Sequence, residues 1–195
     1  MATETTAFGG VARATSTAPT RGLQEPTAGP VQQQASATPV QEEADLGKPL
    51  RFRIDAEKVK VDAQVEHVGL TEDNAMDVPK AWENVAWYKL GFTPGEQGNS
   101  VLAGHLDSDT GPAVFWNLKD LKVGEEVSVL MDTGKTLRFR VTKTQVYNAE
   151  EAPIHEIFGP SDSKRLNLIT CDGAFDAETK SYDRRLVVFT DMIDQ

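Results

Sequence analysis

The sequence offers little that could form a disulfide, span a membrane or bind an anionic polymer. Its 195 residues include one cysteine, Cys171, which cannot form a disulfide within the chain and so leaves the redox compartment open. No apolar run approaches the ~18 residues that span a bilayer, and the N-terminus has no apolar core of the length that a secretory signal needs. With 20 basic residues against 30 acidic ones and a formal charge of -10, the chain is not expected to bind nucleic acid or an anionic membrane surface.

Motifs for metals and phosphate-bearing cofactors are also missing. One cysteine and three histidines, with no two at ligand spacing, predict no zinc site. The acidic loop "DSDTG" at 107–111 lacks the full ligand series and the closing glutamate of a calcium loop. There is no glycine-rich phosphate loop and no G-x-S-x-G motif. We therefore expect neither a metal nor a cofactor.

The chain divides into two parts of different composition. Residues 1–48 are mostly Thr, Ala, Gln, Pro and Gly, with no apolar periodicity. Such a segment cannot bury enough apolar surface to offset its ordering entropy, so we predict a disordered spacer. It is either a stalk that holds a domain off a surface or an arbitrary tail, and composition does not choose between them. Residues 49–195 are predicted to form the folded domain.

Strand signals dominate the second part. Short apolar-alternating or β-branched runs are separated by turn sequences such as "TPGEQG", "DTGK" and "FGPSDS", which predicts an all-β domain, a closed or nearly closed barrel. Helix signals are few: 79–88 has a spacing that allows one short helix begun by Pro79, and 113–121 allows one helical turn. The expected strands are 50–54, 59–68, 99–105, 125–131, 135–147, 165–171 and 184–193.

Cys171 ends the expected strand "LNLITC", and Asp172 and Gly173 are expected to turn the chain directly after it. A free cysteine in this position is either a small buried hydrophobe or a nucleophile. A free thiol has a pKa near ~8.5, so a nucleophilic role requires a nearby cation or base.

Three histidines are candidates for that base. His67 lies in an alternating strand and reads as a surface or edge position, and His155 lies in a loop-like segment. His105 closes "SVLAGH", where Ala103 and Gly104 are small enough for a ligand to approach, and a polar loop follows. These surroundings suit an acid or base near neutral pH.

Two adjacent arginines, Arg184 and Arg185, open the last strand. Alternation places them on opposite faces, with Arg185 on the side of Val187 and Phe189. An arginine beside Cys171 could stabilise the oxyanion of an acyl-transfer intermediate, whereas the other arginine is ordinary strand-edge charge.

Taken in order, "VLAGH", "LITC" and "RLVVF" resemble the signature segments of sortases, the cysteine transpeptidases of bacterial surfaces. Further similar segments, "PLRFRI", "VDAQVEHVGL", "MDVP" and "AWYKLGF", follow in family order, and the likeness runs from about residue 50 to 193. "PGEQGNSVLAGH", "GPAVFWNL" and "CDGAFD" look most similar to the class E/F group, which occurs in Gram-positive and related bacteria.

The resemblance implies an eight-stranded sortase-type β-barrel with one or two short helices. His105, Cys171 and an arginine would converge at one rim of that barrel as the catalytic residues. Arg185 directly precedes "LVV", where the family's arginine usually stands, and Arg184 stays open. Ala103, Ile169 and Thr170, beside these residues on their strands, are the expected substrate-binding residues, and the segment 148–163 is expected to wall the groove.

The implied reaction is a two-step acyl transfer. Cys171 would attack a threonine carbonyl in a C-terminal sorting motif of the LPXTG type, carried by a surface protein. The thioacyl intermediate would then pass to an amine from a cell-wall peptide or a pilin lysine. The implied location is extracytoplasmic, at the cell surface, with membrane contact only through an N-terminal anchor that this chain lacks. The alternatives are a non-catalytic β-barrel binding module with a buried cysteine, and another cysteine peptidase or an L,D-transpeptidase.

Overall fold

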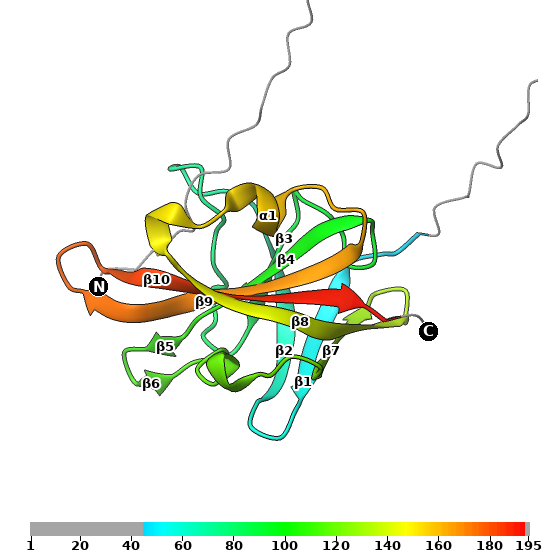
Figure 1. Cartoon of the computed structure of the whole chain (residues 1–195), viewed down its shortest axis with the longest axis horizontal. Coiled ribbons are helices and arrows are strands. Elements are labelled where there is room, and N and C mark those ends of the chain that lie inside the picture. Colours follow the sequence, from blue (N-terminus) through cyan, green and yellow to red (C-terminus); the bar gives the residue numbers. More distant parts are fainter. Residues whose placement is uncertain (1–44, 194–195) are drawn as a thin grey trace, which may run out of the picture. The chain divides into compact units, whose positions relative to one another are not determined.

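The alternating apolar segments build a closed barrel of eight strands within residues 45–193, the part of the chain that this computed structural model describes (Figure 1). Around the barrel the strand order is β1-β2-β3-β4-β9-β10-β8-β7. β2 pairs with β3 and β4 pairs with β9 in parallel, and the other neighbours are antiparallel. The strands are β1 (Pro49–Asp55), β2 (Lys60–Val68), β3 (Val85–Tyr88), β4 (Gly98–Gly104), β7 (Glu126–Met131), β8 (Thr136–Asn148), β9 (Lys164–Asp176) and β10 (Ser181–Met192).

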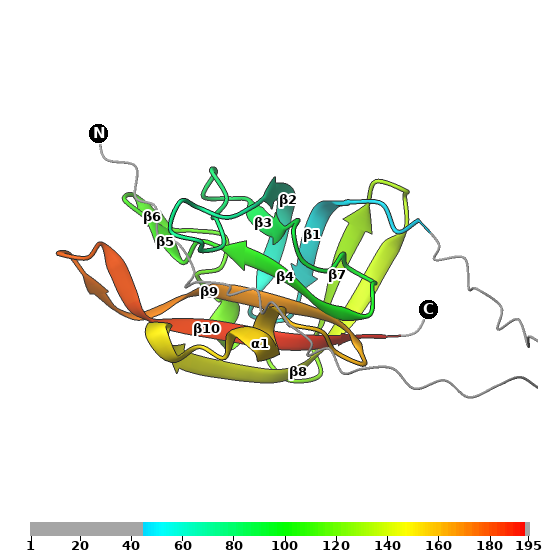
Figure 2. The ribbon, with the colours of Figure 1, turned by 90° about the horizontal axis from the view of Figure 1, so that it is seen from above.

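Smaller elements connect these strands. They are the two-stranded sheet of β5 (Asp107–Ser108) and β6 (Gly111–Pro112), the 3-10 helices η1 (Leu118–Asp120) and η2 (Ala149–Glu151), and the short helix α1 (Ile154–Phe158). Figures 1 and 2 show the β5–β6 hairpin and the far end of the β9–β10 hairpin extending from the same side of the barrel. The predicted all-β barrel with one or two short helices is confirmed.

The helix predicted over 79–88 is wrong. Residues 80–83 form a turn, and Val85–Tyr88 is the strand β3. All four residues of β3 are buried, because the strand lies in the barrel wall between β2 and β4 and has apolar layers on both faces. A strand buried on both faces does not alternate, so its apolar run resembles a helical pattern. The helical turn expected in 113–121 is present as η1, whereas α1 lies in a segment that reads as a loop.

Two apolar layers lie on opposite faces of the sheet formed by β4, β9 and β10. The inner layer fills the barrel, and the outer layer lies against α1. Alternation along each strand assigns neighbouring residues to different layers: Leu168 belongs to the inner layer, and Ile169 belongs to the outer one. Cys171 and Arg185 have the parity of the outer layer, so the strands direct both side chains to the outer face.

The predicted spacer, residues 1–48, lies outside the described residues except for 45–48. Over residues 45–193, no helix is both long enough and apolar enough to cross a bilayer.

Candidate active site

Cys171 lies within β9, so the prediction that the strand ends there is wrong. β9 continues to Asp176 and pairs with β10 on both sides of Cys171. Gly173 makes a bulge instead of a turn: the register shifts at this point, and the glycine has a φ of 89°. A Cβ on Gly173 would lie 2.0 Å from Oδ1 of Asp183, so a side chain there has to displace the Asp183 carboxylate, which accepts from the Ala174 N–H.

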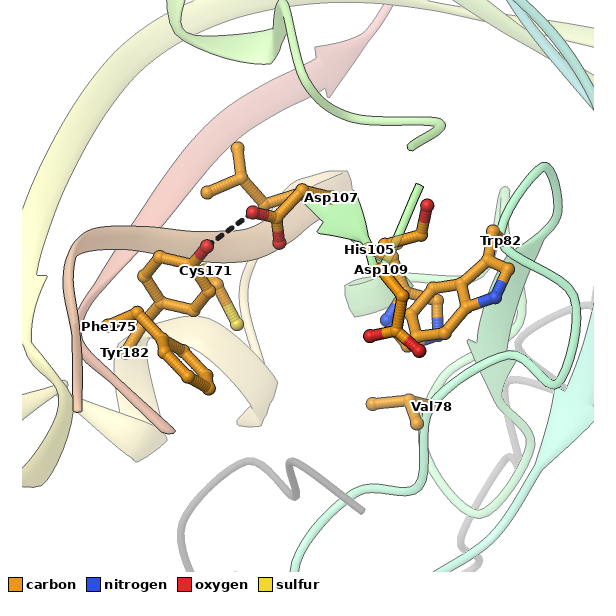
Figure 3. A pocket seen from close by; sticks show the side chains of 11 residues that line it. Val78, Trp82, His105, Asp107, Asp109, Cys171, Phe175 and Tyr182 are labelled. Atoms are coloured by element: carbon orange, nitrogen blue, oxygen red, sulfur yellow. Dashed lines mark hydrogen bonds between the residues drawn. The ribbon is translucent and has the colours of Figure 1, made fainter. Parts of the chain in front are cut away.

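A pocket of about 360 Å³ opens on the outer face beside Cys171 (Figure 3). The thiol is half-buried and lines this pocket. The other lining residues come from the turn before β3, the end of β4, the β5–β6 segment and the β9–β10 hairpin. The lining residues are Val78, Trp82, Gly104, His105, Leu106, Asp107, Ser108, Asp109, Cys171, Phe175 and Tyr182.

His105 reaches the pocket because it directly follows β4. β4 is the parallel neighbour of β9, with Ala103 opposite Ile169, and the Thr170 hydroxyl donates to the Gly104 carbonyl at 2.8 Å. Continued by two residues on each strand, this register brings His105 level with Cys171. Figure 3 shows the two side chains on opposite sides of the pocket.

Two groups from the turn before β3 contact the His105 ring. Nε2 lies 2.8 Å from the carbonyl oxygen of Pro79, and the Trp82 ring lies 4.3 Å away, centroid to centroid, tilted by 58°. A carbonyl oxygen only accepts hydrogen bonds, so Nε2 carries the proton. In the neutral imidazole, Nδ1 is therefore the nitrogen that can accept a proton.

Arg185 is buried and pairs directly with Cys171 across β9 and β10. Its guanidinium donates to the carbonyls of Tyr182 at 2.7 Å and Arg184 at 2.8 Å, and to the Ser181 hydroxyl at 3.3 Å. These contacts hold a cation beside the thiol and tie it to the base of the β9–β10 hairpin.

Arg184 has a different environment. It is exposed, with Nε 3.6 Å from a carboxylate oxygen of Asp172 and 3.9 Å from one of Asp183. The two arginines therefore lie on opposite faces, as alternation predicts, and Arg185 is the one directed to the face of Cys171.

The surroundings of Cys171 favour the neutral form of its thiol. Burial raises the pKa of the Cys171 thiol, the positive charge of Arg185 opposes this, and the carboxylate of Asp107 raises the pKa further. Asp107 is in turn bonded to Tyr182, whose hydroxyl donates to Oδ2 at 2.5 Å. This bond joins β5 to the β9–β10 hairpin across one wall of the pocket (Figure 3).

The family model described as "Sortase domain" matches residues 54–193, most of this chain. The chain belongs to the sortase family.

Solved sortases share this fold. The sortase has 25% identity and a TM-score of 0.58 to sortase C-1 from Actinomyces oris, over 74% of each chain. Its TM-score to sortase A from Corynebacterium diphtheriae is 0.57 with 19% identity, over 76% of this chain and 62% of that one. Its TM-score to sortase A from Listeria monocytogenes is 0.55 with 21% identity, over 74% of this chain and 86% of that one. No match to a curated protein sequence was found.

The family assignment decides between the alternatives that the sequence left open. Sortases are cysteine transpeptidases, so this chain is an enzyme and not a binding module with an inert cysteine. The pocket position of Cys171 agrees with that assignment.

The expected substrate-binding residues lie below the surface of the sortase. Ala103 and Ile169 are buried in the outer apolar layer, and Thr170 is buried with its hydroxyl on the Gly104 carbonyl. Among the described residues that line the pocket, none of these three occurs. The segment 148–163 carries η2 and α1, and Ile154 and Ile157 of α1 pack on that layer.

The other two histidines of the sortase lie elsewhere. His67 is exposed, with Nε2 2.8 Å from the Pro49 carbonyl, and His155 is exposed on α1. Within residues 45–193, no group of three or more His, Cys, Asp and Glu side chains is arranged to hold a metal ion.

Most of the pocket lining is not predicted from the sequence, including Trp82, Asp107 and Tyr182. Asp107 lies only two positions after His105, and this proximity is the one signal that points to it. Trp82 falls in the segment whose spacing indicates a helix, and nothing in the pattern around Tyr182 indicates a place in a pocket.

Proposed function

We propose that this sortase cleaves a C-terminal sorting motif of the LPXTG type and transfers the acyl group to an amine. The observation that carries the proposal is the shared pocket of Cys171 and His105, with Arg185 directly opposite Cys171 on the next strand. The donors are surface proteins with the motif, and the acceptor is an amine of a cell-wall peptide or a pilin lysine. The enzyme works outside the cytoplasm, at the cell surface, and its class is the E/F group.

The first step joins the Cys171 sulfur to the threonine carbonyl carbon of the motif. Because burial raises the pKa of the thiol, the sulfur enters the reaction protonated. Its proton has to leave as the S–C bond forms, and Nδ1 of His105 is the acceptor that the Pro79 contact leaves free of a proton.

The tetrahedral intermediate places negative charge on the former carbonyl oxygen. Arg185 supplies a fixed positive charge beside the sulfur, and a well-placed donor to such an oxyanion contributes typically ~3 kcal/mol. The intermediate collapses by breaking its C–N bond. The His105 imidazolium gives its proton to the departing amine, and a thioester on Cys171 remains.

The second half reverses these transfers. The acceptor amine attacks the thioester carbonyl and gives a proton to His105, a new C–N bond forms, and the C–S bond breaks. The Cys171 thiolate then takes the proton back from His105, so no proton or electron is left unaccounted for.

The pocket walls suggest how the motif is held. Phe175 offers apolar surface on the Cys171 side of the pocket, and Val78 offers it on the opposite side, near Trp82 (Figure 3). These are the residues to which we assign the apolar side chains of the motif. Contact of the substrate with Ala103 or Ile169 requires the segment 148–163 to move away, because both are buried in the outer layer, and Thr170 has the parity of the inner layer.

The test is the turnover of a fluorogenic LPXTG-type peptide by Cys171→Ala and His105→Ala, with mass spectrometry of the thioester formed by the unmodified enzyme. Both variants should lose nearly all activity, and the intact enzyme should gain the acyl mass in the absence of an amine. His155→Ala is the matched control, since that histidine is exposed on α1 and is not among the residues that line the pocket. Undiminished turnover in either pocket variant removes that residue from the mechanism.

A further inference from the structure

Glu66, on β2, lies outside the pocket lining, but its carboxylate holds the turn that contacts His105. Oε2 accepts from the backbone N–H of Lys80 at 2.9 Å, and Oε1 accepts from the N–H of Ala81 at 3.2 Å and from the Asn84 side chain at 2.9 Å. One side chain therefore takes three donors from a single short segment. Lys80 and Ala81 lie before β3, so their N–H groups are bonded by the Glu66 side chain and not by the ladder of β2 and β3.

The carboxylate is kept in its charged form. Burial raises the pKa of Glu66, but the bonds from Lys80, Asn84 and Ala81 together outweigh burial and the pKa is lowered. Hydrogen bonds to an ionised acceptor are roughly twice as strong as neutral ones. Such a turn is held more firmly than a loop stabilised by backbone bonds alone.

The same turn supplies both contacts to the His105 ring. The Pro79 carbonyl, next to Lys80, meets Nε2 at 2.8 Å, and the Trp82 ring, next to Ala81, covers the imidazole at 4.3 Å. The Trp82 carbonyl is fixed as well, by the N–H of Val114 at 3.0 Å. The imidazole thus rests on a segment whose own position depends on Glu66.

We propose that Glu66 is a positioning residue for the acyl transfer: through the turn 79–84 it fixes the His105 ring and its Nε2–H tautomer, which reserves Nδ1 for the proton of Cys171. The inference rests on the proposed function only in one respect, the transfer of the Cys171 proton to Nδ1 of His105. Its structural part, the control of the tautomer by a residue of another strand, is independent of any substrate.

The experiment measures the His105 tautomer by ¹⁵N chemical shifts and, in parallel, kcat and KM for the motif peptide. The variants are Glu66→Ala, Glu66→Asp and Glu66→Gln. Glu66→Ala should give a mixture of tautomers and a kcat about 10²-fold lower with little change in KM, because a misplaced general base costs about that much. Glu66→Asp keeps the charge, but its side chain is one methylene shorter and cannot reach the N–H groups of the turn. It should therefore also give mixed tautomers and a lower kcat. Glu66→Gln keeps one acceptor oxygen but sets its NH2 group against an N–H donor of the turn and removes the charge, so it should recover only part of the activity and of the single tautomer.

The matched control is Glu83→Ala, which removes an exposed glutamate of the same turn and should change neither readout. If Glu66→Ala fails to fold, Glu66→Asp carries the test. A single Nε2–H tautomer and an unchanged kcat in Glu66→Asp overturn the proposal. If the unmodified enzyme turns over no sorting peptide, the proposed function fails, but the tautomer in the Glu66 variants still decides whether this residue positions the ring.

Discussion

Cys171 and Arg185 are direct cross-strand partners in the antiparallel ladder of β9 and β10, so one strand register fixes the distance between sulfur and cation. The guanidinium is held there by two backbone carbonyls and one hydroxyl of its own hairpin. Its charge counteracts the effect of burial on the thiol. The neighbouring Arg184 is directed to the other face and pairs with surface carboxylates.

This pairing predicts that Arg185, and not Arg184, is required for turnover of the motif peptide. Arg185→Ala should lower kcat for the motif peptide by about 10²–10³-fold, the usual cost of losing one oxyanion-stabilising group. Arg185→Lys should also be impaired, because a lysine keeps the charge but cannot reproduce the planar donor set that reaches the Tyr182 and Arg184 carbonyls. The measurement is steady-state turnover, with circular dichroism to confirm folding. Arg184→Ala is the matched control and should stay within about twofold of the unmodified enzyme; the reverse order would exclude the assignment.

The pH dependence of thiol reactivity follows from the surroundings of Cys171. Burial raises the pKa of the thiol, so the rate of alkylation by iodoacetamide should rise through a midpoint above the ~8.5 of a free cysteine. Asp107→Asn removes a charge that raises the pKa, so its midpoint should shift to lower pH. Asp109→Asn is the control, since it neutralises another carboxylate of the pocket lining, and it should leave the midpoint of Cys171 nearly unchanged. A midpoint well below that of a free thiol would contradict this description of the pocket.

The Tyr182 hydroxyl joins the β9–β10 hairpin to Asp107 of β5 across the pocket wall. Tyr182→Phe keeps the ring and removes this bond to a carboxylate, which should reduce the free energy of unfolding by about 1.5–3 kcal/mol. Because the bond shapes the pocket and not the reacting groups, KM should rise more than kcat falls. Urea unfolding and peptide kinetics measure the two effects. Tyr147→Phe, on β8, removes a hydroxyl outside the pocket lining, and an equal rise in KM there would argue against a specific role of Tyr182.

Gly173 is required by both its backbone and its surroundings. Its φ of 89° disfavours any side chain, and a Cβ would meet Oδ1 of Asp183 at 2.0 Å and Nε of Arg184 at 2.6 Å. Gly173→Ala should therefore destabilise the fold by more than the about 1–3 kcal/mol of backbone strain alone, because the Asp183 carboxylate that bonds the Ala174 N–H has to move. It should also lower kcat/KM at least about tenfold, since the bulge lies two residues after Cys171. Urea unfolding and peptide turnover provide the measurements.

Gly124→Ala separates the two causes. Gly124 has a similar φ of 94°, but an added Cβ meets nothing within 4 Å. Gly124→Ala should therefore lower the free energy of unfolding only by the backbone strain, and it should leave kcat/KM unchanged. Equal destabilisation of the two variants would show that the space around Gly173 is not limiting.

The barrel could be predicted from strand alternation, and the meeting of His105 and Cys171 at one pocket could be predicted from the three ordered segments that resemble sortases. β3 could not, since a strand buried on both faces has no alternation to detect. The bulge at Gly173 could not either, because "CDGAFD" is equally compatible with a turn and with a strand that continues. Glu66 looks like any outward polar residue of an alternating strand, and only the arrangement of the turn after β2 gives it a partner.

The pairing of β4 with β9 has a consequence for when the enzyme becomes competent. Thr170 and Gly104, which are bonded next to Cys171 and His105, are 66 positions apart, and pairing strands so far apart in the sequence is a slow step of folding. A chain that has not completed this seam carries a solitary thiol with no imidazole beside it. If the two side chains act together as proposed, such a chain has no transpeptidase activity, and the onset of activity in a refolding experiment reports on the pairing of β4 with β9.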